Sequence, residues 1–390
     1  MSLRDQITDI LAASVENREC AGVNVLIRRH GEELLYTQAG MADIEEGRLI
    51  QRESLFRLYS QTKPITAAAV MLLAERGLID LMDGVDKFLP GFRNPKVVDA
   101  QGVITPAPRA PWIMELLGMT AGLSYPDADP AGQYAARVFE EAHEAIRKGG
   151  GIPTVEFINR LGQQPLAFQP GTHWRYSTCA DVLGAVVEVV SGKRFGDFLR
   201  EELFIPLEMP DTGFFVPEEK RERFVTCYER TEKGLVPWLG MHLACGEYSR
   251  DPAFESGGAG LVSTLEDYSH FADMMMNGGL WNGKRILSPA SVKFLTTPQL
   301  GDAVRRDLWD SLNGYSYGKL CRVCVEPERV AGLAIPAEYG WDGWLGTYFC
   351  NFPNEGITLL SMQNVTNMGT APVVRKVRNA LLAALSRGEI

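Results

Sequence analysis

Several features that would assign this chain to a specialised class are missing from its sequence. No run of apolar residues reaches the roughly 18 that a membrane helix needs, and the best is the short segment ITAAAVMLLA. No basic block could neutralise a nucleic-acid backbone, because 49 acidic residues outnumber 39 basic ones and give a net charge of −10. These absences argue against a membrane protein and against a nucleic-acid partner.

Cysteine and histidine are scarce and scattered. The seven cysteines are an odd set without a framework spacing, which favours reduced thiols in a cytosolic protein over disulfides. Cys321 and Cys324 form a C-x-x-C pair without a second pair, and the five histidines lack metal-ligand spacing. We therefore expect no metal and no other cofactor. The N-terminal segment lacks the apolar core of a signal peptide, so we expect a cytoplasmic location.

The 390 residues that are present suffice for two domains or for one composite domain. Apolar residues at helical spacing open the chain, and the segment AGVNVLIRRHGEELLYTQAG then predicts two strands around a turn. From residue 60 to about 280 the pattern is mostly helical, with long loops that contain proline and glycine. Strand-like runs return at 314–327, 333–353 and 356–364, and a final amphipathic helix closes the chain.

This order predicts an α+β fold with one antiparallel sheet built from both chain ends and flanked by the terminal helices. Residues 1–59 and 256–390 are expected to form a discontinuous sheet domain. Residues 60–255 are expected to form a mostly helical inserted domain, with the active site where the two domains meet.

Two motifs can be set aside by their context. The segment GGLWNGKR at 278–285 nearly matches a phosphate-binding loop, but Arg285 replaces the final Ser or Thr and a helix precedes it instead of a strand. The segment GYSYG at 314–318 matches the nucleophile elbow of α/β hydrolases around Ser316. That elbow requires a helix after the serine and a histidine further along the chain. Here a strand-like run follows Ser316, and all five histidines precede it.

The S-x-x-K pattern occurs twice, and geometry separates the two copies. Ser316 and Lys319 lie on a predicted strand, where positions i and i+3 point to opposite faces. Ser60 and Lys63 lie at the start of a predicted helix, where the same spacing places both on one face. Only the second pair can share a proton.

Ser60 and Lys63 have two interpretations. Unpaired N–H groups and the helix dipole favour an oxyanion at a helix start, and a lysine desolvated by the apolar stripe behind it can act as the base of a serine nucleophile. Alternatively, Ser60 only caps the helix and Lys63 is solvated. The residues alone leave both interpretations open.

Five segments of the sequence together resemble a known family. They are, in chain order, SQTKPITAAAVMLLAERGLIDLMDGVDKFLPGF, ELLGMTAGLSY, QPGTHWRYSTCADVLGAVVEVVSGKRFGDFLREELFIPLEMPDTGF, ESGGAGLVSTLEDYSHFADMMMNGG and EYGWDGWLGTYF. The family is that of the serine hydrolases related to class C β-lactamases, penicillin-binding carboxypeptidases and family VIII carboxylesterases. The resemblance is collinear from about residue 3 to residue 385 and implies a β-lactamase/transpeptidase-like fold.

The resemblance also implies a catalytic site. Ser60 would be the nucleophile, Lys63 its partner, and Tyr176 the general acid and base. The third family motif falls on Trp341, Asp342 and Gly343. The backbone N–H of the next residue, Trp344, would join that of Ser60 as the second oxyanion donor.

Two departures from the family pattern concern the substrate. β-Lactamases carry an Asn two places after the tyrosine, where this chain has Thr178, and a cationic residue opens their third motif, where this chain has Trp341. Both changes remove groups that hold a β-lactam, and Trp341 fits the esterase branch. Asp342 adds a negative charge that would repel acidic substrates or attract an amine.

We therefore predict a serine hydrolase that cleaves esters or amides of small molecules through a Ser60 acyl-enzyme, closest to the family VIII carboxylesterases. The alternatives are a class C-type β-lactamase or D-peptide carboxypeptidase, and a penicillin-binding-like receptor that is acylated without turnover. The sequence does not identify the acyl group, its acceptor or the oligomeric state.

Overall fold

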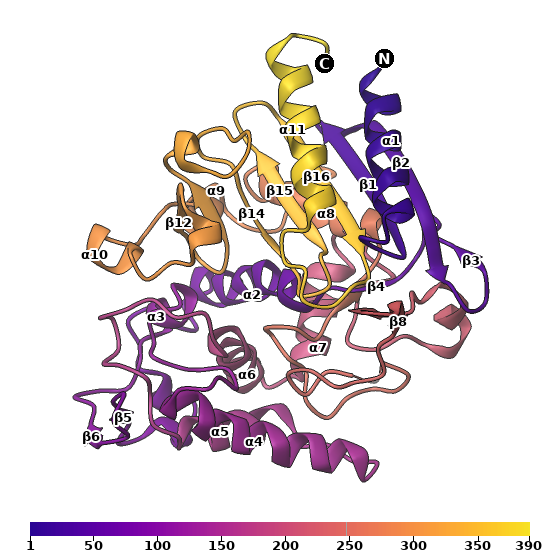
Figure 1. Ribbon diagram of the computed structural model, residues 1–390. Helices are drawn as coiled ribbons and strands as arrows, with labels where there is room; N and C mark the ends of the chain where they lie inside the picture. The colour runs from indigo at the N-terminus through magenta and orange to yellow at the C-terminus, as the bar shows by residue number, and fades with distance from the viewer. Residues whose placement is uncertain (247) are drawn as a thin grey trace.

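The structure is a computed structural model that describes residues 1–246 and 248–390. Its centre is an eight-stranded antiparallel sheet in the order β12-β13-β14-β15-β16-β1-β2-β3 (Figure 1). The N-terminal strands are β1 (Gly22–Arg29), β2 (Glu32–Asp43) and β3 (Arg48–Leu49). The C-terminal strands are β12 (Tyr315–Tyr317), β13 (Arg322–Cys324), β14 (Tyr339–Asp342), β15 (Tyr348–Phe352) and β16 (Ile357–Gln363).

The two ends of the chain meet where β1 pairs with β16. Val23 lies opposite Gln363, and the register continues without a break to Arg29 opposite Ile357. The predicted sheet from both chain ends, and the α+β fold class with it, is therefore confirmed.

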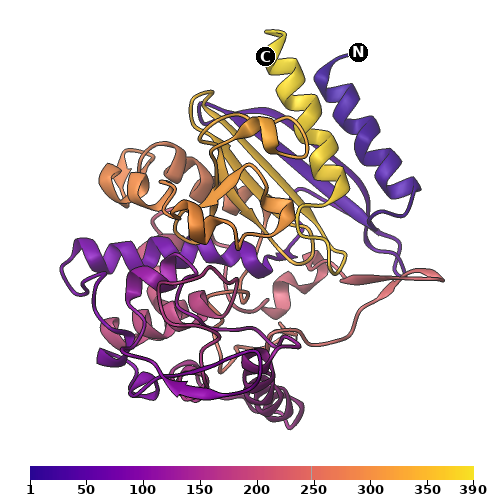
Figure 2. The same cartoon turned by 60° about the vertical axis from the view of Figure 1, so that its left-hand side comes forward.

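Alternate side chains of each strand point to opposite faces of the sheet, and both faces are covered by other elements. Val25 and Leu359 face the terminal helices α1 (Leu3–Glu16) and α11 (Pro372–Ser386), which lie side by side (Figure 2). Leu26 and Leu360 face the other way, into the core that includes α8 (Leu265–Met276).

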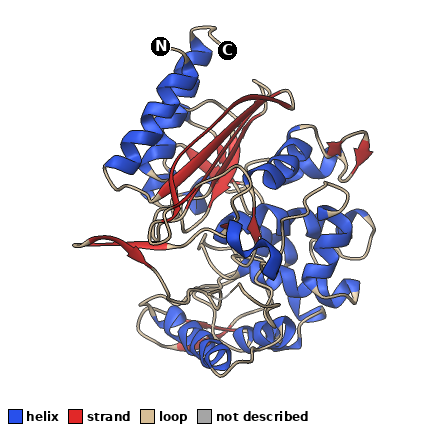
Figure 3. Ribbon diagram, turned by 90° about the vertical axis from the view of Figure 1, so that its right-hand side faces the viewer, coloured by secondary structure: helices blue, strands red, loops and turns tan. Residues whose placement is uncertain are grey.

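The helices between residues 60 and 255 lie together beside the sheet (Figure 3). They are α2 (Lys63–Glu75), α3 (Ile113–Leu117), α4 (Pro130–Arg147), α5 (Thr154–Gly162), α6 (Cys179–Ser191) and α7 (Phe195–Leu199). Helix α2 packs against α6, and its apolar side chains continue into the core beneath the sheet. The domain boundaries given above remain a prediction.

The remaining elements are short. The helices are α9 (Pro289–Leu295) and α10 (Asp302–Arg305). The strands form four small ladders: β4 (Phe56–Arg57) with β9 (Val262–Ser263), β5 (Lys96–Val98) with β6 (Ile104–Pro106), β7 (Tyr228–Thr231) with β8 (Gly234–Pro237), and β10 (Leu280–Trp281) with β11 (Lys284–Arg285). Within the part of the chain that the structure describes, no helix combines the length and the apolar character that crossing a membrane requires.

A buried ion pair ties α11 to the turn that precedes β14. Arg378 Nη2 lies 2.7 Å from Glu338 Oε1, and the other arm of the guanidinium donates to the Tyr348 hydroxyl at 2.5 Å. Glu338 is completely buried and also accepts hydrogen bonds from the Tyr315 hydroxyl and the Ile335 N–H. Removing one partner would leave a buried charge without compensation.

We therefore expect Arg378→Met to lower the free energy of unfolding by about 3–5 kcal/mol, the usual effect of breaking a buried ion pair. Urea unfolding followed by circular dichroism measures the change. The control is Arg375→Met on the exposed side of the same helix, which should change the free energy by less than about 0.5 kcal/mol. Equal losses in the two variants would contradict the role given to the pair.

Candidate active site

Ser60 lies in a short 3₁₀ turn, Tyr59–Thr62, that leads directly into α2. Tyr59 is buried and has a left-handed backbone, with φ of 44°, which is uncommon for a residue other than glycine and is often found at functional sites. The N-cap of α2 is Thr62, and no side chain caps the helix. Ser60 is therefore not the capping serine of the alternative interpretation.

Lys63 is fully buried at the first position of α2. Its Nζ lies 3.1 Å from Ser60 Oγ, 3.1 Å from the Tyr125 hydroxyl and 2.8 Å from the Gly258 carbonyl oxygen. Burial lowers the pKa of Lys63 to about 7, and the negative charge of Asp181 opposes this change. The solvated lysine of the alternative interpretation is excluded, and a neutral amine can accept the serine proton.

Tyr176 completes the group that the sequence predicted. Its ring centroid lies 4.5 Å from Lys63 Nζ, and its hydroxyl oxygen accepts a hydrogen bond of 3.0 Å from the Trp341 indole N–H. Burial raises the pKa of Tyr176 far above its ordinary value, although hydrogen bonds from Ser60 and Trp341 oppose the change. The phenol is therefore protonated at neutral pH, and it can act as a hydrogen-bond donor or an acid.

The third motif reaches the serine through a close backbone contact. A Cβ at Gly343 would lie 2.2 Å from the Leu58 carbonyl oxygen, so only glycine fits there. The Thr347 hydroxyl donates to the same carbonyl at 3.0 Å and holds the turn 343–346 against the segment that precedes Ser60. Across the described residues, no acceptor takes the N–H of Trp344, which leaves it available to an oxyanion.

The carboxylate of Asp342 is already paired with neighbouring side chains. It lies 3.1 Å from the buried guanidinium of Arg322 and also accepts a hydrogen bond from the Thr370 hydroxyl. The guanidinium of Arg322 is enclosed by the rings of Tyr315, Trp341 and Tyr348. Its pair with Asp342 neutralises the charge that the sequence suggested would repel acids or attract amines.

A cavity of about 620 Å³ opens in front of Ser60. Tyrosine and tryptophan make up a third of its lining residues, and Tyr176, Trp341, Asp342, Gly343 and Trp344 of the predicted site all line it. Thr178 does not line it: this residue is fully buried, and its hydroxyl donates to the Ser124 carbonyl oxygen at 3.4 Å. The predicted substrate contact through Thr178 is therefore absent from this cavity.

Sequence reasoning missed three contributors to the site. Tyr125 and Gly258 contact the Lys63 amine, and His242 lines the cavity with its ring stacked on Trp344 at 4.2 Å between centroids. Burial lowers the pKa of His242 to about 4, so its ring is neutral at physiological pH. Tyr125 ends the segment ELLGMTAGLSY and Gly258 lies in ESGGAG, so both were within segments that resemble the family, but no local pattern gave them a role.

The second S-x-x-K pair has no comparable arrangement. Ser316 lies in β12, which is followed by a turn and then by strand β13. Ser316 Oγ and Lys319 Nζ are both buried, and neither has a hydrogen-bond partner among the residues described, so they do not bond to each other.

Comparisons with known proteins show the family and the fold of the chain. The family model described as Beta-lactamase matches residues 7–384. Esterase EstB of Burkholderia gladioli is 30% identical over 410 residues, which cover 98% of this chain and 96% of EstB. The solved structure of EstCE1, described as a hydrolase with promiscuous acyltransferase activity, superposes with a TM-score of 0.81 at 26% identity and covers 97% of this chain and 98% of EstCE1.

Simvastatin synthase (LovD) from Aspergillus terreus shares the fold, with a TM-score of 0.80 at 20% identity over 99% of both chains. These findings confirm the predicted resemblance to family VIII carboxylesterases and the predicted class of enzyme. The chain belongs to the beta-lactamase family and is a serine hydrolase that resembles the carboxylesterases of that family.

Proposed function

We propose that the chain hydrolyses small-molecule esters through an acyl-enzyme on Ser60, with Lys63 as the base and Tyr176 as the acid. The observation that carries the proposal is the contact between a fully buried lysine amine and the Ser60 hydroxyl, 3.1 Å apart. A buried amine whose pKa lies near 7 can take the serine proton at neutral pH, which an ordinary lysine cannot do.

Acylation would follow from the positions of these groups. Lys63 takes the Oγ proton while Oγ bonds to the ester carbonyl carbon, and the N–H groups of Ser60 and Trp344 stabilise the oxyanion. Tyr176 then donates its proton to the departing alkoxide, and the proton on Lys63 is returned to Tyr176. Water repeats the sequence on the acyl-enzyme, which releases the acid and restores Ser60.

The charge distribution favours an ester over a β-lactam. The cavity has neither lysine nor arginine among its described lining residues, so a β-lactam carboxylate would find no cation there. Asp342 is already paired with Arg322, and Thr178 points away from the cavity. An ester requires only the nucleophile, the proton relay and the oxyanion donors.

The proposal includes a small-molecule substrate and a reducing, cytoplasmic location. The aromatic cavity supports the first, since cavities of this size and lining suit small molecules. The seven cysteines support the second, because all of them are free and buried.

The first test of the site is covalent labelling. A fluorophosphonate should modify Ser60, because only this serine of the two S-x-x-K pairs contacts its lysine. Peptide mapping by mass spectrometry locates the adduct. Labelling should persist in Ser316→Ala and vanish in Ser60→Ala; an adduct that survives Ser60→Ala would refute the assignment.

The second test concerns the proton relay. We expect Lys63→Ala and Tyr176→Phe each to reduce the acylation rate by about 10² or more, the usual effect of losing a general base or acid. Stopped-flow measurement of p-nitrophenol release gives this rate. An unchanged rate in Tyr176→Phe would mean that the tyrosine serves only in packing.

The third test chooses the substrate class. p-Nitrophenyl acetate or butyrate should be turned over many times with kcat/KM at least tenfold above that for nitrocefin, because each unmet polar partner of the β-lactam costs about 1–3 kcal/mol. Steady-state kinetics on both substrates measure the ratio. A single equivalent of product would favour the receptor that does not turn over, and a preference for nitrocefin would favour the β-lactamase.

A further inference from the structure

Asp181 is a buried carboxylate close to the proposed catalytic lysine. It lies in the first turn of α6, where the helix dipole favours a negative charge, and only 2% of its surface is exposed. Its Oδ1 accepts a hydrogen bond of 2.5 Å from the Ser256 hydroxyl and one of 3.0 Å from the Gly258 N–H. Burial raises the pKa of Asp181, and the charge of Lys63 together with these two hydrogen bonds opposes the change. No lysine or arginine pairs with Asp181 among the residues that the structure describes.

Gly258 lies between Asp181 and Lys63. Its N–H donates to Asp181, and its carbonyl oxygen accepts the 2.8 Å hydrogen bond from Lys63 Nζ. A Cβ on Gly258 would lie 2.8 Å from Asp181 Oδ2 and 3.1 Å from the Tyr125 hydroxyl, so the carboxylate and the phenol enclose this residue. The position of the carbonyl that orients the lysine therefore depends on Asp181.

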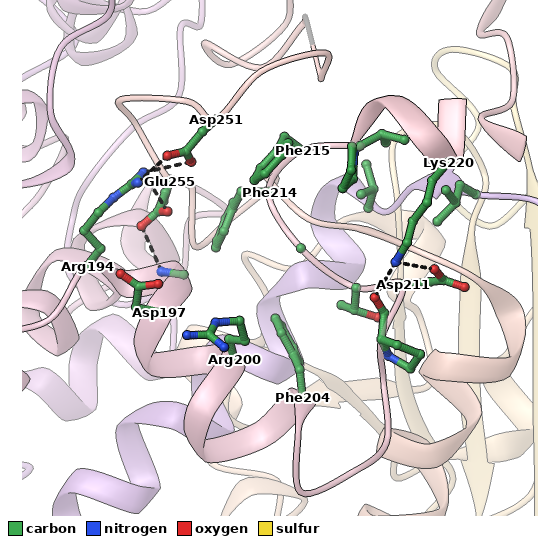
Figure 4. Close-up of a pocket in the computed structure, with 18 residues that line it drawn as sticks. Arg194, Asp197, Arg200, Phe204, Asp211, Phe214, Phe215, Lys220, Asp251 and Glu255 are labelled. Atoms are coloured by element: carbon green, nitrogen blue, oxygen red, sulfur yellow. Dashed lines mark hydrogen bonds and ion pairs between the residues drawn. The ribbon is translucent and has the colours of Figure 1, made fainter. Parts of the chain in front are cut away.

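The segment 255–258 is also held from its other side. Glu255 accepts a hydrogen bond of 2.8 Å from the Gly196 N–H and lies 2.9 Å from Arg194, at the wall of a separate cavity (Figure 4). The Gly257 carbonyl accepts a hydrogen bond of 2.7 Å from Thr66 on α2. Because hydrogen bonds hold Glu255 and Gly257 in place, we expect substitution of Asp181 to affect Lys63 without loosening the whole segment 255–258.

Of the other titratable groups around Lys63, Asp342 adds a negative charge that also favours the protonated amine, and its effect is smaller than that of Asp181. These groups come from every element packed against Lys63: Tyr125, Tyr176, Cys179, His242, Cys245 and Asp342. Burial raises the pKa of both thiols to about 12, raises the pKa of both phenols, and lowers the pKa of His242 to about 4. Asp342 is paired with Arg322. Asp181 is thus the carboxylate in this set without a cation of its own.

We infer that Asp181 is a positioning residue of the catalytic centre, which holds Gly258 for the Lys63 amine and supplies the negative charge that tunes the basicity of that amine. The inference rests on the proposed function of Lys63. Burial alone would make the amine a weak base, and a carboxylate on the far side of one residue partly restores its affinity for the proton.

The test is the pH profile of kcat/KM for p-nitrophenyl butyrate. In the parent enzyme activity should fall below about pH 7, where Lys63 becomes protonated. Asp181→Asn removes the charge and preserves the shape, so the acid limb should move to lower pH by about one pH unit. The plateau should fall about three- to tenfold, because a less basic amine is a weaker general base.

The control is Asp273→Asn, which neutralises another buried carboxylate, on α8, that pairs with Arg28 and does not face Lys63. Its acid limb should stay where it is in the parent enzyme. If Asp181→Asn does not fold, Ser256→Ala serves instead: without that hydroxyl the carboxylate ionises less readily, and the limb should move in the same direction by a smaller amount.

An acid limb that does not move in Asp181→Asn, or in Ser256→Ala where that variant replaces it, would overturn the inference, even if activity falls. This failure is distinct from failure of the proposed function, which would show itself as activity or labelling that survives Ser60→Ala in the parent background.

Discussion

The amine of Lys63 has no access to water, and the rest of the site is arranged around this constraint. Moving its pKa from 10.5 to about 7 corresponds to about 5 kcal/mol of unfavourable environment. The packing of the surrounding side chains must offset this free-energy cost. Helix α2 supplies such packing, since every residue from Lys63 to Leu73 is buried. The three hydrogen bonds of the amine then fix its direction, and one of them leads to Ser60.

The groups that meet at Lys63 come from distant parts of the chain, so the frame that holds them must be rigid. The eight-stranded sheet provides it, with helices covering both faces and β14 presenting Trp341 toward Tyr176. Gly343 and Thr347 attach the same strand region to the Leu58 carbonyl. Ser60, Tyr176 and the turn 343–346 are thus positioned by one continuous body.

The sequence predicted the parts of the site that local rules govern. Helical spacing placed Ser60 and Lys63 on one face, and the alternation and position of the late strands predicted a sheet that uses both chain ends. The prediction that Ser316 and Lys319 do not meet is confirmed, although the strand argument for it is wrong, since β12 ends at Tyr317 and Lys319 lies in the loop that follows. Local rules act over a few residues and are visible in any single sequence.

The contacts that remained hidden join residues far apart in the chain. Nothing near Asp342 indicates that Arg322 neutralises it, and nothing near Lys63 indicates that the Gly258 carbonyl and the Tyr125 hydroxyl would be its partners. The burial of Thr178 at the N-cap of α6, with its hydroxyl on the Ser124 carbonyl, has a related cause. Tertiary packing determines these contacts, and a local sequence pattern carries no information about it.

The pairing of β1 with β16 also has a consequence for synthesis on the ribosome. Strand β1 emerges early, whereas β16 is among the last segments to be translated, so one edge of β1 must wait unpaired for most of elongation. The turn 343–346, which we propose supplies an oxyanion donor, lies in the same late region as β16. The nascent chain therefore carries its serine and lysine long before it can assemble a reactive centre around them.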